Sequence, residues 1–170
     1  LGQSIQGFLG GFKIYVAAFN SPEDYTLAVR REDMEEAKSV LDRIGMRWRE
    51  LPIGGYFHHP QLAPIIEVLR EVFERISVRP PQIPMLSNLT GSFITSPQEL
   101  VADLLESHVK PVRFIEMVNT AFRHGVQSVL SIESSSRPVL PGLVRKNNPL
   151  LKAHRISGFP SIQNLNLAGV

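Results

Sequence analysis

A pair of glycines followed by a pair of histidines and a proline constrains this chain most. Residues 54–60 read Gly-Gly-Tyr-Phe-His-His-Pro, between an expected strand over 47–53 and a long amphipathic segment over 62–76. Two glycines permit a tight turn or the close approach of a ligand, and Pro60 suits the first turn of a helix. A histidine at such a junction can exchange a proton near neutral pH, because its ordinary pKa is about 6.5. A solvent-facing helix start that happens to carry two imidazoles explains the same local features.

The composition is that of a packed protein and excludes several chemistries. Hydrophobic residues make up 43% of the 170 residues and charged residues 20%, which is typical of globular chains. The chain contains no cysteine, so disulfides, thiolate metal sites and a cysteine nucleophile are excluded, and a cytoplasmic location is expected. The net charge of +2 is spread along the chain, so no nucleic-acid partner is expected. No membrane span and no metal site are expected either, from the apolar runs and from the spacing of histidine and acidic residues.

The first third of the chain predicts a small α+β lobe. Strands are expected over 12–19 and 25–31, joined as a hairpin with a longer loop. A helix over 33–44 begins at an aspartate N-cap, repeats apolar residues at helical spacing and ends before a glycine. The strand over 47–53, with Trp48 facing inward, would complete a β-β-α-β unit.

The first eleven residues are rich in glycine, and the start of the sequence is interpreted as the cut end of a longer chain. They place Ser4 in the pattern Gly-Gln-Ser-Ile-Gln-Gly, which is similar to a serine-nucleophile elbow. An elbow serine lies between a strand and a helix, whereas nothing precedes Leu1 and two glycines follow closely. Ser4 is therefore expected to be an end-of-chain residue.

The rest of the chain predicts an α/β layer structure, because helices alternate with short apolar strands. The apolar stripe over 62–76 is expected to face the core, and a serine–proline–glutamate pattern at Ser96 predicts a capped helix start. A buried strand is expected over 126–133, and the tail from Asn147 onward is expected to wrap or link. Further helices are expected over 96–108, 114–122 and 139–145, and a short strand over 83–88.

Four short motifs occur in an order that resembles the malonyl-CoA:acyl-carrier-protein acyltransferases. They lie at residues 20–22, 55–60, 111–114 and 133–143, and the resemblance extends over most of the chain. The Ser-Ser-Arg-Pro-Val-Leu ending at 135–140 looks more like the acyltransferase domains of modular polyketide synthases than like the stand-alone fatty-acid enzyme. Each motif is weak alone, but the four together in this order are fairly specific.

The resemblance implies a serine–histidine acyltransferase. Such an enzyme takes malonyl or a related acyl group from coenzyme A, forms a serine acyl-enzyme, and passes the acyl group to the phosphopantetheine thiol of an acyl carrier protein. It uses the coenzyme A thioester as substrate and binds no cofactor, and its role is in polyketide or fatty-acid synthesis. By position, His58 is the implied catalytic histidine, and the implied substrate-binding residues are Asn20, Tyr56, Phe57 and Ser107.

The resemblance also implies a division of the chain into parts. Residues 1–54 correspond to a partial ferredoxin-like subdomain, residues 55–147 to the C-terminal part of the large hydrolase-like subdomain, and residues 148–170 to a tail or linker. The family's nucleophile elbow, oxyanion-hole glutamine and carboxylate-pairing arginine lie in a first half that this sequence lacks. The implied partners are an acyl carrier protein and neighbouring synthase domains. A catalytically silent docking module and an acyl hydrolase of the same fold remain as alternatives.

Four positions depart from the family's pattern. His59 stands where the family often has serine, so the catalytic role is assigned to His58 alone. Ser107 stands where the family usually has an asparagine or glutamine whose backbone helps to orient the histidine, and a serine carbonyl can do the same. The four-residue motif that ends at His58 has the phenylalanine of malonyl-selective members, but its first two residues fit neither common version, which leaves an unusual acyl group open.

Overall fold

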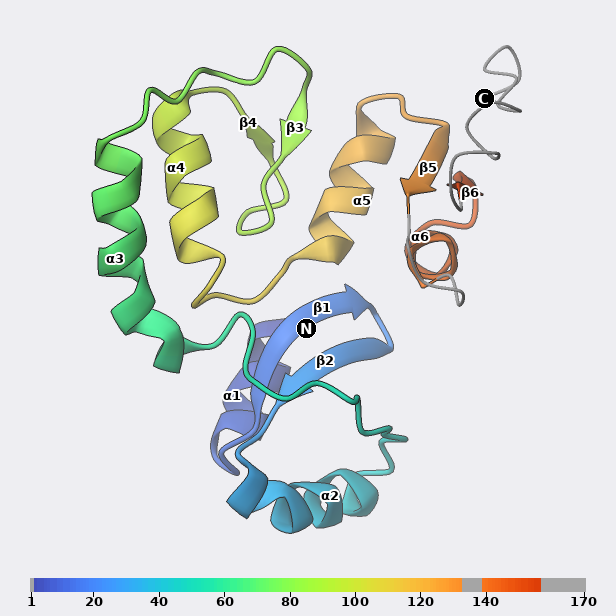
Figure 1. Cartoon of the computed structure of the whole chain (residues 1–170). Coiled ribbons are helices and arrows are strands. Elements are labelled where there is room, and N and C mark those ends of the chain that lie inside the picture. Colours follow the sequence, from blue (N-terminus) through green and yellow to red (C-terminus); the bar gives the residue numbers. More distant parts are fainter. Residues whose placement is uncertain (1, 133–138, 157–170) are drawn as a thin grey trace.

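The computed structural model describes residues 2–132 and 139–156, and its fold is mixed α/β, as predicted (Figure 1). The motif residues over 133–138 lie outside this range. The helices are α1 (Gly2–Gly10), α2 (Met34–Arg43), α3 (Ala63–Glu74), α4 (Pro97–Glu106), α5 (Phe114–Arg123) and α6 (Leu140–Asn147). The strands are β1 (Tyr15–Ser21), β2 (Asp24–Ala28), β3 (Met85–Leu86), β4 (Phe93–Ile94), β5 (Ser128–Ile132) and β6 (Lys152–Ile156), and the 3-10 turns η1 (Arg31–Asp33) and η2 (Pro60–Leu62) precede α2 and α3. Within the described ranges, no helix is long and apolar enough to cross a lipid bilayer.

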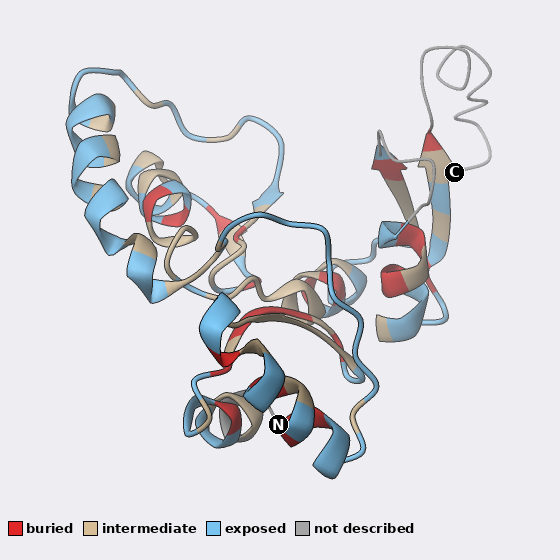
Figure 2. Cartoon of the chain, turned by 60° about the horizontal axis from the view of Figure 1, so that its bottom comes forward, coloured by how far each residue is buried: buried red, intermediate tan, exposed pale blue. Residues whose placement is uncertain are grey.

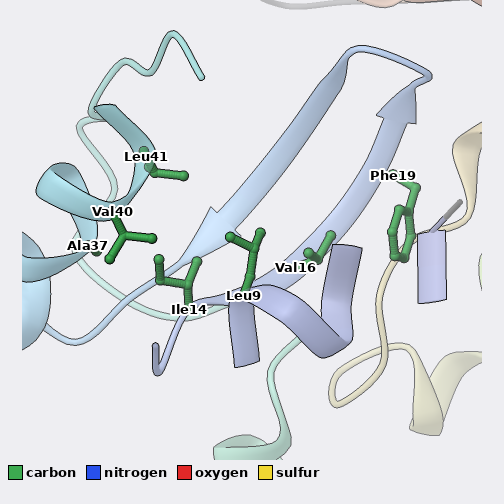
Figure 3. Close-up of a cluster of buried hydrophobic side chains, with 7 residues drawn as sticks. All are labelled: Leu9, Ile14, Val16, Phe19, Ala37, Val40 and Leu41. Carbon is green, nitrogen blue, oxygen red and sulfur yellow. The ribbon is translucent and has the colours of Figure 1, made fainter. Parts of the chain in front are cut away.

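The main hydrophobic core lies between the β1–β2 hairpin and the helices α1 and α2 (Figure 3). The two strands pair antiparallel, as predicted, although the turn between them holds two residues and not a longer loop. The α2 residues in the core recur at the spacing of one helix face, and α2 ends before Gly45, whose φ of +73° suits glycine. The core side chains are Leu9, Ile14, Val16, Phe19, Ala37, Val40 and Leu41.

Strand β1 joins this lobe to the rest of the molecule. On the edge away from β2, the Phe19 N–H donates to the Val112 carbonyl and the Val112 N–H donates to the Ala17 carbonyl, each over 2.9 Å. Val112 thereby forms a parallel bridge with Ala18, and α5 and α6 also contact β1. Figure 1 shows the α3–α4 pair to one side of the hairpin and the β5–α6–β6 unit to the other.

Helix α4 is fixed at its start by a capping box and near its middle by a buried carboxylate. The Ser96 hydroxyl accepts from the Glu99 N–H over 3.2 Å while the Glu99 carboxylate accepts from the Ser96 N–H over 3.3 Å, which confirms the predicted helix start. The buried Asp103 carboxylate accepts from the Ser87 hydroxyl and, over 3.2 Å, from the Leu89 N–H. These bonds hold α4 against the turn that follows β3.

The predicted strand over 47–53 is wrong, since these residues adopt no regular structure. Trp48 is 42% exposed, and its indole N–H donates to the Asp42 carboxylate over 2.9 Å on the surface of α2. An alternating pattern forms a strand only where it pairs with a neighbouring strand, and within the described residues the sheet of β1 and β2 has no third strand. The β-β-α-β unit is therefore not completed within the described residues.

Two predictions of burial are also wrong. The apolar stripe over 62–76 is only partly covered, with Ile65 43% exposed and Val72 and Ile76 each 51% exposed, because α4 covers one side of α3 only (Figure 2). Strand β5 forms as predicted, but Ile132 at its end is 76% exposed. The spacing of apolar residues shows which face of a helix or strand is apolar, but it does not show whether another element of the chain covers that face.

Two segments for which the sequence predicts no helix or strand form one. Residues 2–10 form helix α1, whose Leu9 is 1% exposed in the core. Within the expected tail, Lys152–Ile156 form β6, which pairs in parallel with β5. Leu151 and Ile156 are buried at the two ends of this strand. Contacts with other elements therefore determine the secondary structure of both segments.

We expect Leu9→Ala to lower the free energy of unfolding by about 2–5 kcal/mol, because it opens a cavity between α1 and α2. The matched control is Leu150→Ala, at a leucine that is 73% exposed, which should change it by less than about 0.5 kcal/mol. Urea unfolding followed by circular dichroism measures both. Equal losses in the two variants would contradict the assignment of α1 to the core.

Candidate active site

His58 is half-buried, and its ring is held by one backbone carbonyl. The ring Nδ1 lies 2.5 Å from the carbonyl oxygen of Ser107, which follows the last residue of α4. A carbonyl oxygen can only accept a hydrogen bond, so Nδ1 carries the hydrogen in this contact. In the neutral ring the lone pair then lies on Nε2, which is the nitrogen able to take a proton from a substrate or a nucleophile.

The backbone of His58 is strained. Its φ of +55° lies in the left-handed region, which few residues other than glycine adopt. Such a conformation costs on the order of 1–3 kcal/mol and persists where the surrounding contacts determine it. Strain of this kind is concentrated at functional sites, which makes His58 a candidate for function on structural grounds as well.

Two consecutive carbonyls after α4 accept hydrogen bonds from two consecutive histidines. The Ser107 carbonyl accepts from the His58 ring, and the His108 carbonyl accepts from the His59 N–H over 3.0 Å. The Ser107 hydroxyl instead donates back to the Leu104 carbonyl of α4 over 3.3 Å. Ser107 thus contacts His58 through its backbone, and its side chain belongs to the end of the helix.

The ring of His59 lies between two tyrosines. It stacks on Tyr56 with ring centres 4.8 Å apart and 17° between the planes, and it meets Tyr15 edge-on at 4.8 Å. Its Nδ1 accepts from the Gln61 N–H over 3.1 Å, at the start of η2. Burial, and next the charge of Arg30, lower the pKa of His59 below its ordinary value. His59 is therefore anchored to β1, to η2 and to the segment after α4.

The remaining predicted site residues lie apart from one another. Phe57 is 60% exposed. The Asn20 amide donates to the Thr26 hydroxyl over 3.0 Å, and the Asn20 carbonyl accepts from the Asn147 amide of α6 over 2.7 Å. Asn20 stands five residues along β1 from Tyr15, roughly 17 Å away at the rise of a strand. The structure therefore brings Tyr56, His58 and Ser107 into one region and uses Asn20 to tie the hairpin to α6.

The described residues do not supply a serine elbow beside His58. Ser4 lies inside helix α1 and not at a turn from strand to helix. A hollow of about 410 Å³ lies between α3 and α4, and another of about 560 Å³ lies beside Trp48, but His58 lines neither. In residues 2–132 and 139–156, no group of three or more histidine, aspartate or glutamate residues could hold a metal ion.

The sequence reasoning missed the residues that hold the loop. Tyr15 and the His108 carbonyl both bind His59, from positions 44 residues before it and 49 residues after it. A strand tyrosine and a backbone oxygen carry no signal of such a contact in a single sequence. The pair of histidines was visible, but the support that His59 receives from β1 was not.

The fold is that of about half of an acyl-carrier-protein S-malonyltransferase. The structure of the Burkholderia pseudomallei enzyme superimposes with a TM-score of 0.82 at 24% identity, over 95% of this chain and 54% of that one. MCAT from Streptococcus pneumoniae gives 0.83 at 21% identity, over 99% and 55%. A malonyl-transacylase solved in complex with a type II polyketide synthase acyl-carrier protein gives 0.85 at 24% identity, over 95% and 53%.

Sequence comparison leads to the same family. The chain is 28% identical over 155 residues to the malonyl CoA-acyl carrier protein transacylase of Bacillus subtilis, covering 90% of this chain and 48% of that protein. It is 30% identical over 144 residues to a non-reducing polyketide synthase of Aspergillus terreus, covering 83% of this chain and 6% of the synthase. The sequence matches no protein-family model. The chain is a homologue of the malonyl-CoA:acyl-carrier-protein transacylases and of a segment of polyketide synthases, and it spans about half the length of the transacylase it matches.

We expect the neutral ring of His58 to carry its hydrogen on Nδ1, because the Ser107 carbonyl can only accept. Long-range ¹H–¹⁵N correlation of the histidine rings, recorded above the ordinary histidine pKa of about 6.5, measures this directly. Ser107→Ala is the control and should leave the tautomer unchanged, since it keeps the carbonyl. A His58 ring with its hydrogen on Nε2 would show that the contact is absent in solution.

Proposed function

We propose that this chain is the histidine-bearing part of an acyltransferase. In this proposal, His58 serves a serine that lies outside these residues, and the enzyme moves malonyl or a related acyl group from coenzyme A to an acyl carrier protein. The observation that carries the proposal is the contact of the His58 Nδ1 with the Ser107 carbonyl, which leaves Nε2 as the free base. Homology to a malonyl CoA-acyl carrier protein transacylase supports the reaction class.

In the first half-reaction, the serine hydroxyl gives its proton to the Nε2 of His58 as the serine oxygen attacks the thioester carbon. The carbon–sulfur bond then breaks, and the proton on Nε2 passes to the departing sulfur of coenzyme A. An acyl ester of the serine and a free coenzyme A thiol result. Throughout, the Nδ1–H group stays hydrogen-bonded to the Ser107 carbonyl, and this hydrogen bond keeps the ring in one orientation.

In the second half-reaction, the same nitrogen acts in the reverse order. The Nε2 of His58 takes the proton of the phosphopantetheine thiol on the carrier protein as the sulfur attacks the acyl ester. The serine oxygen leaves and recovers that proton from Nε2, so the enzyme returns to its starting state. No cofactor is required, because the coenzyme A thioester and the carrier thiol are the two substrates.

We also propose that residues 1–54 belong to a ferredoxin-like subdomain and that residues 55–147 form the C-terminal part of the large subdomain. A companion region outside this chain would complete both subdomains and supply the serine. The open surfaces support this. Within the described residues, β5 and β6 form a two-stranded parallel sheet, whereas parallel sheets are normally covered on both faces and two strands alone are marginally stable. The exposed stripe of α3 likewise needs a covering surface.

We expect His58→Ala, made in the full protein that contains this chain, to reduce transfer from malonyl-CoA to its carrier protein by roughly 10²–10⁴-fold, the contribution of a positioned general base. His124→Ala is the matched control, because His124 is an exposed residue at the end of α5, and its activity should stay within about twofold of the parent. A radiolabelled malonyl group, followed onto the carrier protein, gives the measurement.

Three results would argue against the proposal. Unchanged transfer in His58→Ala would remove His58 from the reaction. No transfer by the parent protein, with tight binding of the carrier protein, would favour the silent docking module. Release of free malonate from malonyl-CoA, faster than its transfer to the carrier thiol, would favour the acyl hydrolase.

A further inference from the structure

His59, the residue after His58, is held by contacts of both its backbone and its ring. The His59 backbone N–H binds the His108 carbonyl at 3.0 Å, its ring Nδ1 binds the Gln61 N–H at 3.1 Å, and its ring contacts two tyrosines. None of these contacts involves the His58 Nε2, on which the proposed reaction depends. One of them, the hydrogen bond from the His59 N–H to the His108 carbonyl, is made by the peptide group that joins the two histidines, and the others hold the ring of His59.

We propose that His59 is a positioning residue for His58. By fixing the peptide group that follows His58, it restrains one side of the backbone of His58, whose φ is +55°, and so keeps the ring nitrogen on the Ser107 carbonyl. The catalytic consequence rests on the function proposed above, whereas the positioning itself is a statement about structure. His59 contacts no reacting atom in this proposal.

The contacts explain why a histidine suits this position. An aromatic face is needed between Tyr56 and Tyr15, and a hydrogen-bond acceptor is needed at the start of η2, where Gln61 N–H has no earlier helical partner. Phenylalanine supplies only the face, and asparagine supplies only the acceptor. A neutral imidazole supplies both, and the partial burial of the ring favours that neutral form.

The two neighbouring histidines are therefore expected in opposite tautomers. His58 donates from Nδ1 to a carbonyl, which leaves the hydrogen off Nε2. His59 accepts at Nδ1 from a backbone N–H, which puts its hydrogen on Nε2. This opposition gives a spectroscopic signature that stability alone does not produce.

The test uses three substitutions that divide the contacts of His59. His59→Phe keeps the aromatic face, His59→Asn keeps the acceptor, and His59→Ala removes both, with His124→Ala as the control. The tautomer of His58 is read by long-range ¹H–¹⁵N correlation on the folded protein, and kcat and KM for malonyl transfer are measured in the full protein that contains the chain.

We expect His59→Ala to convert the His58 ring to a mixture of both tautomers and to lower kcat by roughly 10–100-fold, the effect of misplacing a catalytic group by about 1 Å. KM should change less than kcat, since His59 reaches the substrate only through its contact with Tyr56. The asparagine and phenylalanine variants should each keep more of the Nδ1–H form and more of kcat than the alanine variant does.

Retention of the single Nδ1–H tautomer in His59→Ala, with kcat within about twofold of the parent, would overturn the proposal. Should that variant not fold, as judged by its amide spectrum, the asparagine and phenylalanine variants decide, and a parent-like tautomer and kcat in both would overturn it equally. Failure of the proposed function is a separate result, because it appears as unchanged transfer in His58→Ala while the tautomer of His58 still reports on His59.

Discussion

The arrangement of the histidines depends on the pairing of Val112 with β1. Two backbone hydrogen bonds of 2.9 Å fix Val112 on a strand that forms part of the main core. Val112 follows α4 by a few residues, so its place on β1 determines where the Ser107 and His108 carbonyls lie. The capping box and the buried carboxylate of Asp103 fix α4 from the other direction. The Ser107 and His108 carbonyls thus lie in a short segment that is fixed at one end by α4 and at the other end by Val112.

The same strand reaches the histidine loop by a second route. Tyr15, at the start of β1, meets the ring of His59 and also donates from its hydroxyl to the Val109 carbonyl over 3.4 Å. The loop, the strand and the segment after α4 therefore contact one another pairwise. A strained conformation survives only where the surroundings allow no easier one, and this closed set of contacts provides that condition for His58.

What the sequence predicts correctly here depends on neighbours along the chain, and what it misses depends on neighbours in space. The cap at Ser96 and the end of α2 at Gly45 are decided within one or two turns, and both are confirmed. A strand over 47–53 would need a partner strand that the local pattern does not specify, and the pairing of β6 with β5 joins residues 24 apart. At the site, the family resemblance marked both His58 and Ser107, but no pattern within one sequence shows that Tyr15 supports the loop.

A neutral acceptor behind the histidine has a chemical consequence for the proposed reaction. Where a carboxylate orients a catalytic histidine, it also adds a negative charge beside the reacting group. The Ser107 carbonyl orients the ring of His58 through one hydrogen bond and adds only a dipole. A malonyl group brings its own carboxylate, and a second carboxylate a few ångströms away in a site closed from water would repel it by Coulomb interaction. Orientation by a backbone oxygen therefore suits a base that must work next to an anionic acyl group, and it makes the position of the oxygen, not the identity of the side chain at 107, the property on which the site depends.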